Sequence, residues 1–348
     1  MSFPVYQPII RLRSSIDIAA AASFSVDAKY VSVAGDSGVD VWVLPHPSLD
    51  VKFVGMRILN FICDSAVSSM AWFLFQENKR DVLVLGFESG EVFTEMSLQA
   101  LGNTSVLCIT PRQRVIEAGG WGDLAICLAD GSVCSCSVTS NGTVAVNFCA
   151  ELQLELPVFV QFCPQSGDLL VFSPSGPNMQ KLDGETGLLI CKVSGSKACF
   201  PLGSPDTWST TITDMQSSDC EVINYIGSLD TGVPFAWGRN HVDLAEGGRV
   251  VIAGTMSGKI MVLGTPSGYL NQVFEDSVQG KLQAMATIAA QDRHLIVVAY
   301  GKSSLVANVV IFEKIITPES QSMSKQFGYC AVVVALLCLF YVIVVLST

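Results

Sequence analysis

A short turn that contains glycine recurs along this chain of 348 residues. Each turn is preceded by about five apolar residues and followed by a second short run typical of a strand. The turn glycines are Gly38, Gly90, Gly131, Gly176 and Gly258. They lie 52, 41, 45 and 82 residues apart, and the last interval is twice 41. The chain is therefore a repeat of units of roughly 40 to 50 residues, and such a period restricts the fold to few architectures.

The doubled interval predicts a degenerate unit near residue 217. Thr210–Gly227 lies there, with polar Gln216, Ser217 and Ser218 between two strand-like runs. A last unit covers Arg293–Phe312, which brings the total to seven. Several short alternating strands in each unit fit four-stranded sheets with two apolar faces, and only a closed ring of sheets buries both faces.

We therefore predict an all-β fold, a seven-bladed β-propeller that covers residues 1–313. The segment Tyr6–Arg13 (YQPIIRLR) is strand-like and precedes the first unit. It is predicted to supply the outer strand of the last sheet, which otherwise ends at Glu313. Residues 314–326 contain Pro318 and several serines and are predicted to be a short linker.

The first unit, FSVDAKYVSVAGDSGVDVW (Phe24–Trp42), resembles a WD40 repeat. In that family a strand Ser or Thr, a turn Asp and a Trp of the third strand join a His in a buried hydrogen-bond network. Ser32, Asp36 and Trp42 match three of these roles, and no His stands at the fourth. Later units depart further, since Phe93 replaces the Trp in the second. The resemblance implies a platform that binds protein partners.

The segment Phe327–Leu346 contains twenty residues and no charge. As a helix it would span about 30 Å, the thickness of a hydrocarbon core. Lys325 precedes it and only Ser347 and Thr348 follow, so we predict a single-pass, tail-anchored protein whose propeller lies in the cytosol. The apolar helix and uncharged tail favour the endoplasmic reticulum or another endomembrane over the mitochondrial outer membrane.

The charge pattern favours protein partners over nucleic acid. The net charge is −11, and no run rich in Lys or Arg is present to bind phosphates. Basic residues are expected in loops that lead into the sheets, and acidic residues in turns within them. Together they form a predicted partner-binding rim: Arg13, Arg112, Lys197, Arg239, Lys281, Asp36, Glu88 and Asp130. The alternative is that these charges pair with one another or with water.

Metal and cofactor sites are not predicted. The chain has twelve cysteines without a CxxC pair, and its three histidines are far apart. Most cysteines lie in apolar, strand-like runs, where a thiol acts as a small hydrophobic group. We therefore expect free, reduced cysteines.

No catalytic motif is complete. Ala253–Lys259 approximates a phosphate-binding loop, but Ile260 stands where a Ser or Thr is needed and the next residues continue a strand. Gly35–Gly38 lacks the GxSxG spacing of a hydrolase nucleophile. We predict a non-enzymatic interaction scaffold. A hydrolase that uses the central channel has no residues to support it.

One regulatory alternative stays open. The layout is similar to guanine-nucleotide exchange factors of the endoplasmic reticulum, which carry a propeller ahead of one membrane helix and load small GTPases for coat assembly. Those proteins act through an extended loop in the early part of the propeller. The nearest candidate here is Pro45–Ser65, which lengthens the first interval but is largely apolar and strand-like.

Overall fold

The computed structural model describes residues 5–45, 56–61, 64–152, 157–163, 166–173, 178–194, 209–214, 224–230, 242–246, 250–255, 258–264, 269–275, 280–290, 293–301 and 307–316. These ranges contain 27 β-strands and no helix. The described part of the chain therefore has the all-β class predicted from the repeats.

Residues 19–194 form four sheets in chain order, and all their strand pairs are antiparallel except one. The first sheet contains β2 (Ala19–Phe24), β3 (Tyr30–Gly35), β4 (Gly38–Val43) and β5 (Met56–Phe61). The second contains β6 (Val67–Phe75), β7 (Arg80–Phe87), β8 (Glu91–Thr94) and β9 (Ser97–Ala100), and the short β11 (Val115–Ile116) pairs in parallel with β6 as its fifth strand. The third contains β10 (Val106–Pro111), β12 (Gly122–Leu128), β13 (Ser132–Val138) and β14 (Val144–Glu151). The fourth contains β15 (Phe159–Phe162), β16 (Leu169–Phe172), β17 (Asn178–Leu182) and β18 (Leu189–Ser194).

Three more sheets follow. The fifth has two described strands, β19 (Ser209–Asp214) and β20 (Asn224–Asp230). The sixth contains β21 (Val242–Ala245), β22 (Val250–Gly254), β23 (Lys259–Gly264) and β24 (Leu270–Glu275). The last contains β25 (Lys281–Ala290), β26 (Arg293–Gly301), β27 (Asn308–Ile315) and β1 (Gln7–Arg13). The degenerate unit predicted near residue 217 thus has its two strands, with residues 215–223 outside the described ranges.

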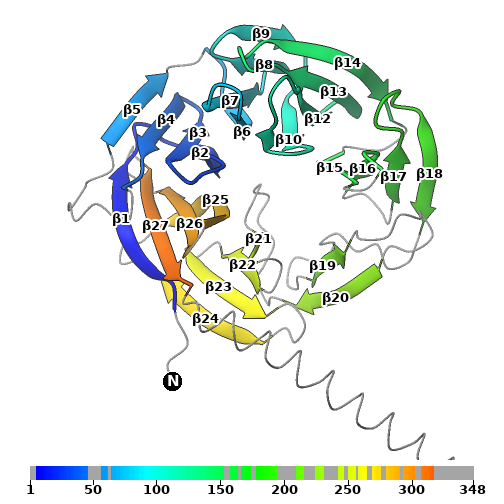
Figure 1. Cartoon of the computed structure of the whole chain (residues 1–348). Helices are drawn as coiled ribbons and strands as arrows, with labels where there is room; N and C mark the ends of the chain where they lie inside the picture. Colours follow the sequence, from blue (N-terminus) through cyan, green and yellow to red (C-terminus); the bar gives the residue numbers. More distant parts are fainter. Residues whose placement is uncertain are drawn as a thin grey trace, which may run out of the picture.

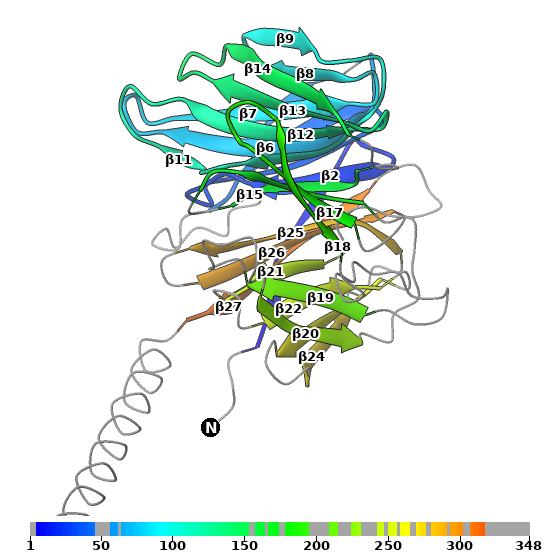
Figure 2. The same cartoon turned by 90° about the vertical axis from the view of Figure 1, so that its right-hand side faces the viewer.

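The sheets stand around a central axis, with β2, β10, β15, β21 and β25 toward the axis and β5, β9, β14, β18, β24 and β1 on the perimeter (Figure 1). First strands of neighbouring sheets contact one another. For example, β2 contacts β25 and β6, and β10 contacts β6 and β15. Figure 2 shows the same sheets from the side. Equivalent turns of successive sheets therefore lie on the same face of the ring.

The apolar core is divided into layers between neighbouring sheets. One cluster joins the last sheet to the first, and others fill the gaps between the first and second, second and third, and third and fourth sheets. A further cluster lies between the sixth and last sheets. Each sheet alone would expose both apolar faces, so burial requires a neighbour on each side.

The predicted turn glycines adopt backbone conformations that favour glycine. Gly38, Gly90, Gly131 and Gly258 all have positive φ angles, while Gly176 is outside the described residues. At Gly90, φ is +90° and an added Cβ would lie 2.6 Å from a backbone oxygen of Thr104. The recurring glycine is therefore required by turn geometry and close backbone approach.

The N-terminal segment is paired with the end of the described chain. β1 runs antiparallel to β27, with Gln7 opposite Glu313 and Arg13 opposite Asn308. The backbone of Tyr6 also exchanges two 3.0 Å hydrogen bonds with the side chain of Gln272, in the sixth sheet. The last sheet therefore includes strands from both ends of the described chain.

Several sequence predictions fall wholly or partly outside the described residues. The described residues include no helix long and apolar enough to cross a membrane, and the predicted membrane segment 327–346 is not among them. Of the predicted linker 314–326, only 314–316 are described, and β27 continues into it as far as Ile315. In Pro45–Ser65, residues 56–61 form β5, the outer strand of the first sheet.

Candidate functional site

One face of the ring, here called the turn face, carries the turns between second and third strands. In the first three sheets each such turn donates a backbone hydrogen bond to the segment leading into the first strand. These bonds run from Asp36 to Ile18, from Glu88 to Ala66 and from Ala129 to Ser105. The loops that lead into the sheets and the turns within them therefore meet on one face, as the rim hypothesis requires.

Five of the eight predicted rim residues lie on the turn face. Asp36, Glu88 and Asp130 are exposed within the turns. Arg13 ends β1 just before the first sheet, and Lys281 begins β25, and both side chains are exposed. The turn face thus combines charges of both signs. Lys197 and Arg239 lie outside the described residues.

The assignment of Arg112 to this rim was wrong. Arg112 follows β10, and its backbone N–H donates a 2.9 Å hydrogen bond to Asp123 at the start of β12. Because β10 and β12 are antiparallel, with Val106 opposite Leu128, this end of the sheet is the one away from Asp130. Arg112 follows a first strand, whereas the rim requires residues that precede one.

The three residues that carry the WD40 resemblance do not bond to one another in the described structure. Ser32 accepts a 2.9 Å hydrogen bond from the indole N–H of Trp72, in the second sheet. Asp36 accepts one from the backbone N–H of Ile18. Trp42 is buried in the apolar layer against the last sheet. Ser32 therefore links two sheets, and within its own sheet its hydroxyl donates to the carbonyl oxygen of Ser23, not to Asp36 or Trp42.

A different carboxylate is buried in the first unit. Asp40 is fully buried and accepts hydrogen bonds of 2.7 Å from the side chain of Ser14 and from the backbone N–H of Ser15. These bonds attach the segment between β1 and β2 to the third strand of the first sheet. Sequence reasoning missed this role because the turn residue Asp36 fits the family pattern and Asp40 does not.

A partly open polar cavity of about 370 Å³ lies between the third and fourth sheets, on the face opposite the turn face. We call it the blade-junction cavity. Its walls are formed mainly by strand residues of the third sheet and by two loops of the fourth sheet. The lining residues are Arg112, Asp123, Ser135, Asn147, Phe162, Ser166, Gly167, Asp168, Asp183, Gly184 and Glu185.

Glycines allow the loops of the fourth sheet to approach the third sheet closely. A Cβ at Gly167 would lie 2.5 Å from the guanidinium of Arg112, and one at Gly187 would lie 2.5 Å from the ring of Phe148. A Cβ at Gly184 would lie 2.0 Å from the carbonyl oxygen of Gly167. Larger side chains at these positions would fill or distort the cavity wall.

The cavity is rich in carboxylates. Arg112 lies 3.6 Å from Asp123, and Lys181 lies 2.9 Å from Asp168. Burial acts to raise the pKa of Asp168, but hydrogen bonds from Ser166 and Lys181 and the charge of Lys181 lower it overall. Hydrogen bonds from Thr186 lower the pKa of Asp183. These groups are therefore ionised at neutral pH.

The loop between β10 and β12 reaches across the same face. Its residues Val115 and Ile116 form β11, which pairs in parallel with β6 at the inner edge of the second sheet. The guanidinium of Arg114 donates to the carbonyl oxygen of Phe24, in the first sheet. Trp121 in this loop is 56% exposed. The loop therefore ties three sheets together and presents an aromatic side chain.

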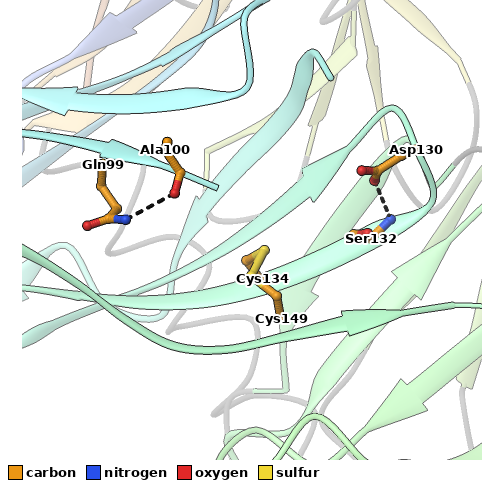
Figure 3. The surroundings of a disulfide bond; sticks show 6 residues. All are labelled: Gln99, Ala100, Asp130, Ser132, Cys134 and Cys149. Carbon is orange, nitrogen blue, oxygen red and sulfur yellow. Dashed lines mark hydrogen bonds between the residues drawn. A yellow bond between two sulfur atoms is a disulfide. The ribbon is translucent and has the colours of Figure 1, made fainter. Parts of the chain in front are cut away.

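A disulfide joins Cys134 on β13 to Cys149 on β14 (Figure 3). The prediction of free cysteines was wrong for this pair. Cys134 is buried, whereas Cys149 is exposed on the outer strand. Five other described cysteines carry thiols: Cys108, Cys127, Cys136, Cys163 and Cys191. The two partners are 15 residues apart, and cross-strand register, not local spacing, places them together.

Comparisons with known proteins identify the architecture. No protein-family model matches the chain, and no match to a protein of curated function is found. Among 1249 similar solved chains, the WD40 β-propeller domain of Doa1 has a TM-score of 0.62 and 12% sequence identity. The match covers 89% of this chain and 97% of that chain. At this identity the likeness shows the fold alone, a WD40-like propeller.

Proposed function

We propose that this chain is a non-enzymatic scaffold that presents a seven-bladed propeller to protein partners from the surface of a membrane. In this assignment, β19 and β20 belong to the fifth blade, and β1 completes the seventh. WD40-like propellers generally serve as platforms for protein partners. The observation that carries the proposal is the gathering of Arg13, Lys281, Asp36, Glu88 and Asp130 on the turn face. A surface of mixed charge selects partners of complementary charge and speeds their encounter.

Charge reversal at the turn face tests the proposal. The variant Arg13→Glu/Lys281→Glu changes the sign of both described basic rim residues, and Lys79→Glu, in the hairpin between β6 and β7 on the other face, is the matched control. Proximity labelling from the full membrane-bound chain should recover a defined partner set with the wild type and the control. The double variant should reduce that set severalfold. An unchanged set in the double variant would overturn the rim as the docking surface.

The membrane part of the proposal rests on residues 327–346, which would anchor the chain in the endoplasmic reticulum or another endomembrane with the propeller in the cytosol. Two described features make this orientation testable. A disulfide is typical of oxidising compartments, in contrast to the cytosol. In addition, Asn103 and Asn141 are exposed, and each begins a glycosylation acceptor sequence.

Glycosidase treatment of the full chain expressed in a eukaryotic cell separates the two orientations. A cytosolic propeller predicts no change in electrophoretic mobility, because acceptor asparagines are modified only in the lumen. A mobility shift that disappears in Asn103→Gln/Asn141→Gln would place the propeller in the lumen and contradict the proposed orientation. Permeabilisation-dependent protease access gives the same distinction without relying on glycans.

A further inference from the structure

The blade-junction cavity has more negative than positive charge. Four of its lining side chains are carboxylates, and one, Arg112, is basic. Asp123 is near Arg112, and Asp168 is paired with Lys181. Within the described residues, no cation lies within salt-bridge distance of Asp183 or Glu185, at the loop between β17 and β18. A positively charged group from outside the chain would therefore find complementary charge in this cavity.

An apolar strand edge begins next to these carboxylates. Leu188, Leu189 and Ile190 follow the cavity loop directly and are 69%, 48% and 49% exposed. Leu189 and Ile190 begin β18, which pairs with β17 and is the last strand of its sheet. No described strand pairs with its other edge. Extended segments add to such edges through backbone hydrogen bonds, while neighbouring pockets select their side chains.

The cavity also has the size and construction of a side-chain pocket. Its volume of about 370 Å³ falls at the lower end of ligand pockets, which typically begin near 300 Å³. Rigid elements hold its walls, because Asp123, Ser135 and Asn147 are strand residues of the third sheet. A 2.9 Å hydrogen bond from the Asn147 amide to Ser137 fixes the polar wall. One long side chain fits such a space.

We propose that the blade-junction cavity binds an arginine or lysine side chain of a partner segment that adds in extended form to the outer edge of β18. The carboxylates of Asp183 and Glu185 accept hydrogen bonds from the basic group. Apolar residues beside it in the segment cover Leu188, Leu189 and Ile190. This inference deepens the proposed scaffold function by naming a partner class, and it uses the face opposite the rim residues.

A pair of synthetic peptides tests the proposal directly. Each is nine residues long, end-capped and fluorescently labelled, with alternating valine and threonine around a central residue. That residue is arginine in the probe and citrulline, its uncharged analogue of similar shape, in the control. Fluorescence anisotropy with the full chain in lipid nanodiscs should show the arginine peptide binding about tenfold more tightly. Equal affinities, or no binding of either peptide, would overturn the proposal.

Two matched variants locate the binding site. In Asp183→Asn/Glu185→Gln the shapes and most hydrogen bonds are kept, so the tenfold preference for arginine should disappear. In Asp36→Asn/Glu88→Gln the same loss of charge occurs on the turn face, and the preference should remain. A preference for arginine that survives in Asp183→Asn/Glu185→Gln and disappears in Asp36→Asn/Glu88→Gln would overturn the proposal. Leu189→Asp should weaken the binding of both peptides about equally. Undiminished binding would exclude the β18 edge as the place where the peptides bind.

Failure here is distinguishable from failure of the scaffold function. The peptide assay reports only on the blade-junction cavity and β18. The partner set recovered by proximity labelling depends in the proposal on Arg13 and Lys281. Loss of peptide binding with an intact, rim-dependent partner set would reject the cavity inference and keep the scaffold. Binding of the arginine peptide without any rim-dependent set would reject the rim and keep the cavity.

Discussion

Two junctions between neighbouring sheets are filled in different ways. Between the first and second sheets, the packed junction, Trp72 stacks on Tyr30 at a centroid distance of 5.8 Å and donates a hydrogen bond to Ser32. The junction between the third and fourth sheets is called the open junction. One part of it is an apolar layer that includes Val133 and Leu169, and another part of it contains the blade-junction cavity. The same repeat thus produces one junction that serves stability and another that leaves space for a ligand.

The physical difference lies in the size of the residues at the two junctions. Trp72 is 5% exposed and fills the packed junction with the largest side chain available. At the open junction, Gly167 and Gly187 bring loops of the fourth sheet close to the third sheet, and Gly184 lets two of these loops approach each other. Small residues at the open junction therefore leave space that a large side chain fills at the packed one.

Emptying the packed junction should have the largest effect on stability. Trp72→Ala removes a buried aromatic side chain and leaves a cavity, so we expect a loss of about 4 kcal/mol in the free energy of unfolding. Trp72→Phe keeps much of the contact with Tyr30 and loses only the N–H donor, so its loss should be clearly smaller. Chemical denaturation measures both. A loss below 1 kcal/mol for Trp72→Ala would contradict the packed junction.

Removing the disulfide should have the next largest effect. The Cys134–Cys149 bond closes a 15-residue separation within the sheet that walls the open junction. Cross-links of this length stabilise by about 3 kcal/mol through the unfolded chain. Without reductant, Cys149→Ser should be less stable than the wild type by that amount. With reductant, which breaks the bond in the wild type, the two proteins should be equally stable. Cys108→Ser, at a thiol of the same sheet, is the control. Equal stability of Cys149→Ser and wild type without reductant would show that the bond does not form.

The packed junction also contains a carboxylate whose ionisation opposes folding. Burial and the charge of Asp27 raise the pKa of Asp81 to about 6, against a weaker opposing effect of Lys29. Its Oδ1 atom is buried without a hydrogen-bond partner in the described structure. The folded state therefore holds this proton more tightly than the unfolded state, whose pKa is near 4. This contribution lowers stability as the pH rises from about 4 to 6.

The variant Asp81→Asn removes that pH-dependent contribution. We expect a gain of about 1 kcal/mol at pH 7.5, after allowance for solvent around this half-buried group, and no gain at pH 4. Denaturation curves at the two pH values measure the difference. A gain of equal size at both values would mean that proton binding by Asp81 is not its cause.

The smallest effect is expected at the wall of the open junction. Asn147 is exposed and lines the cavity, so Asn147→Ala should change the free energy of unfolding by about 0.5 kcal/mol or less. In the peptide assay the same variant should weaken binding measurably, because the polar wall loses its anchor. A destabilisation as large as that of Trp72→Ala would show that both junctions serve stability.

The sequence predicted features that repeat. Glycine spacing located the turns because Gly38, Gly90, Gly131 and Gly258 occupy a backbone conformation that other residues avoid. The strand character of Tyr6–Arg13 follows from its own alternation, and this segment contributes β1. Each of these features depends on residues that are close together in the chain, so it can be recognised from one sequence.

Features that depend on strand register or on contacts between sheets could not be predicted from short segments of the sequence. Arg112 was placed on the wrong face because its position relative to a strand end requires the strand boundaries. The Cys134–Cys149 pairing depends on a register that includes a β-bulge between Ser135 and Cys136. The blade-junction cavity depends on loops of two neighbouring sheets, and no motif in the sequence marks it.

The central claim is a ring of sheets whose last member contains strands from both ends of the described chain. Hydrogen–deuterium exchange of the full chain tests it most directly, by comparing the backbone amides of residues 7–13 with those of residues 308–315. Paired strands should be protected together for hours and should lose protection together when Leu12→Asp is introduced. Exchange of residues 7–13 within seconds, while residues 308–315 stay protected, would contradict the account.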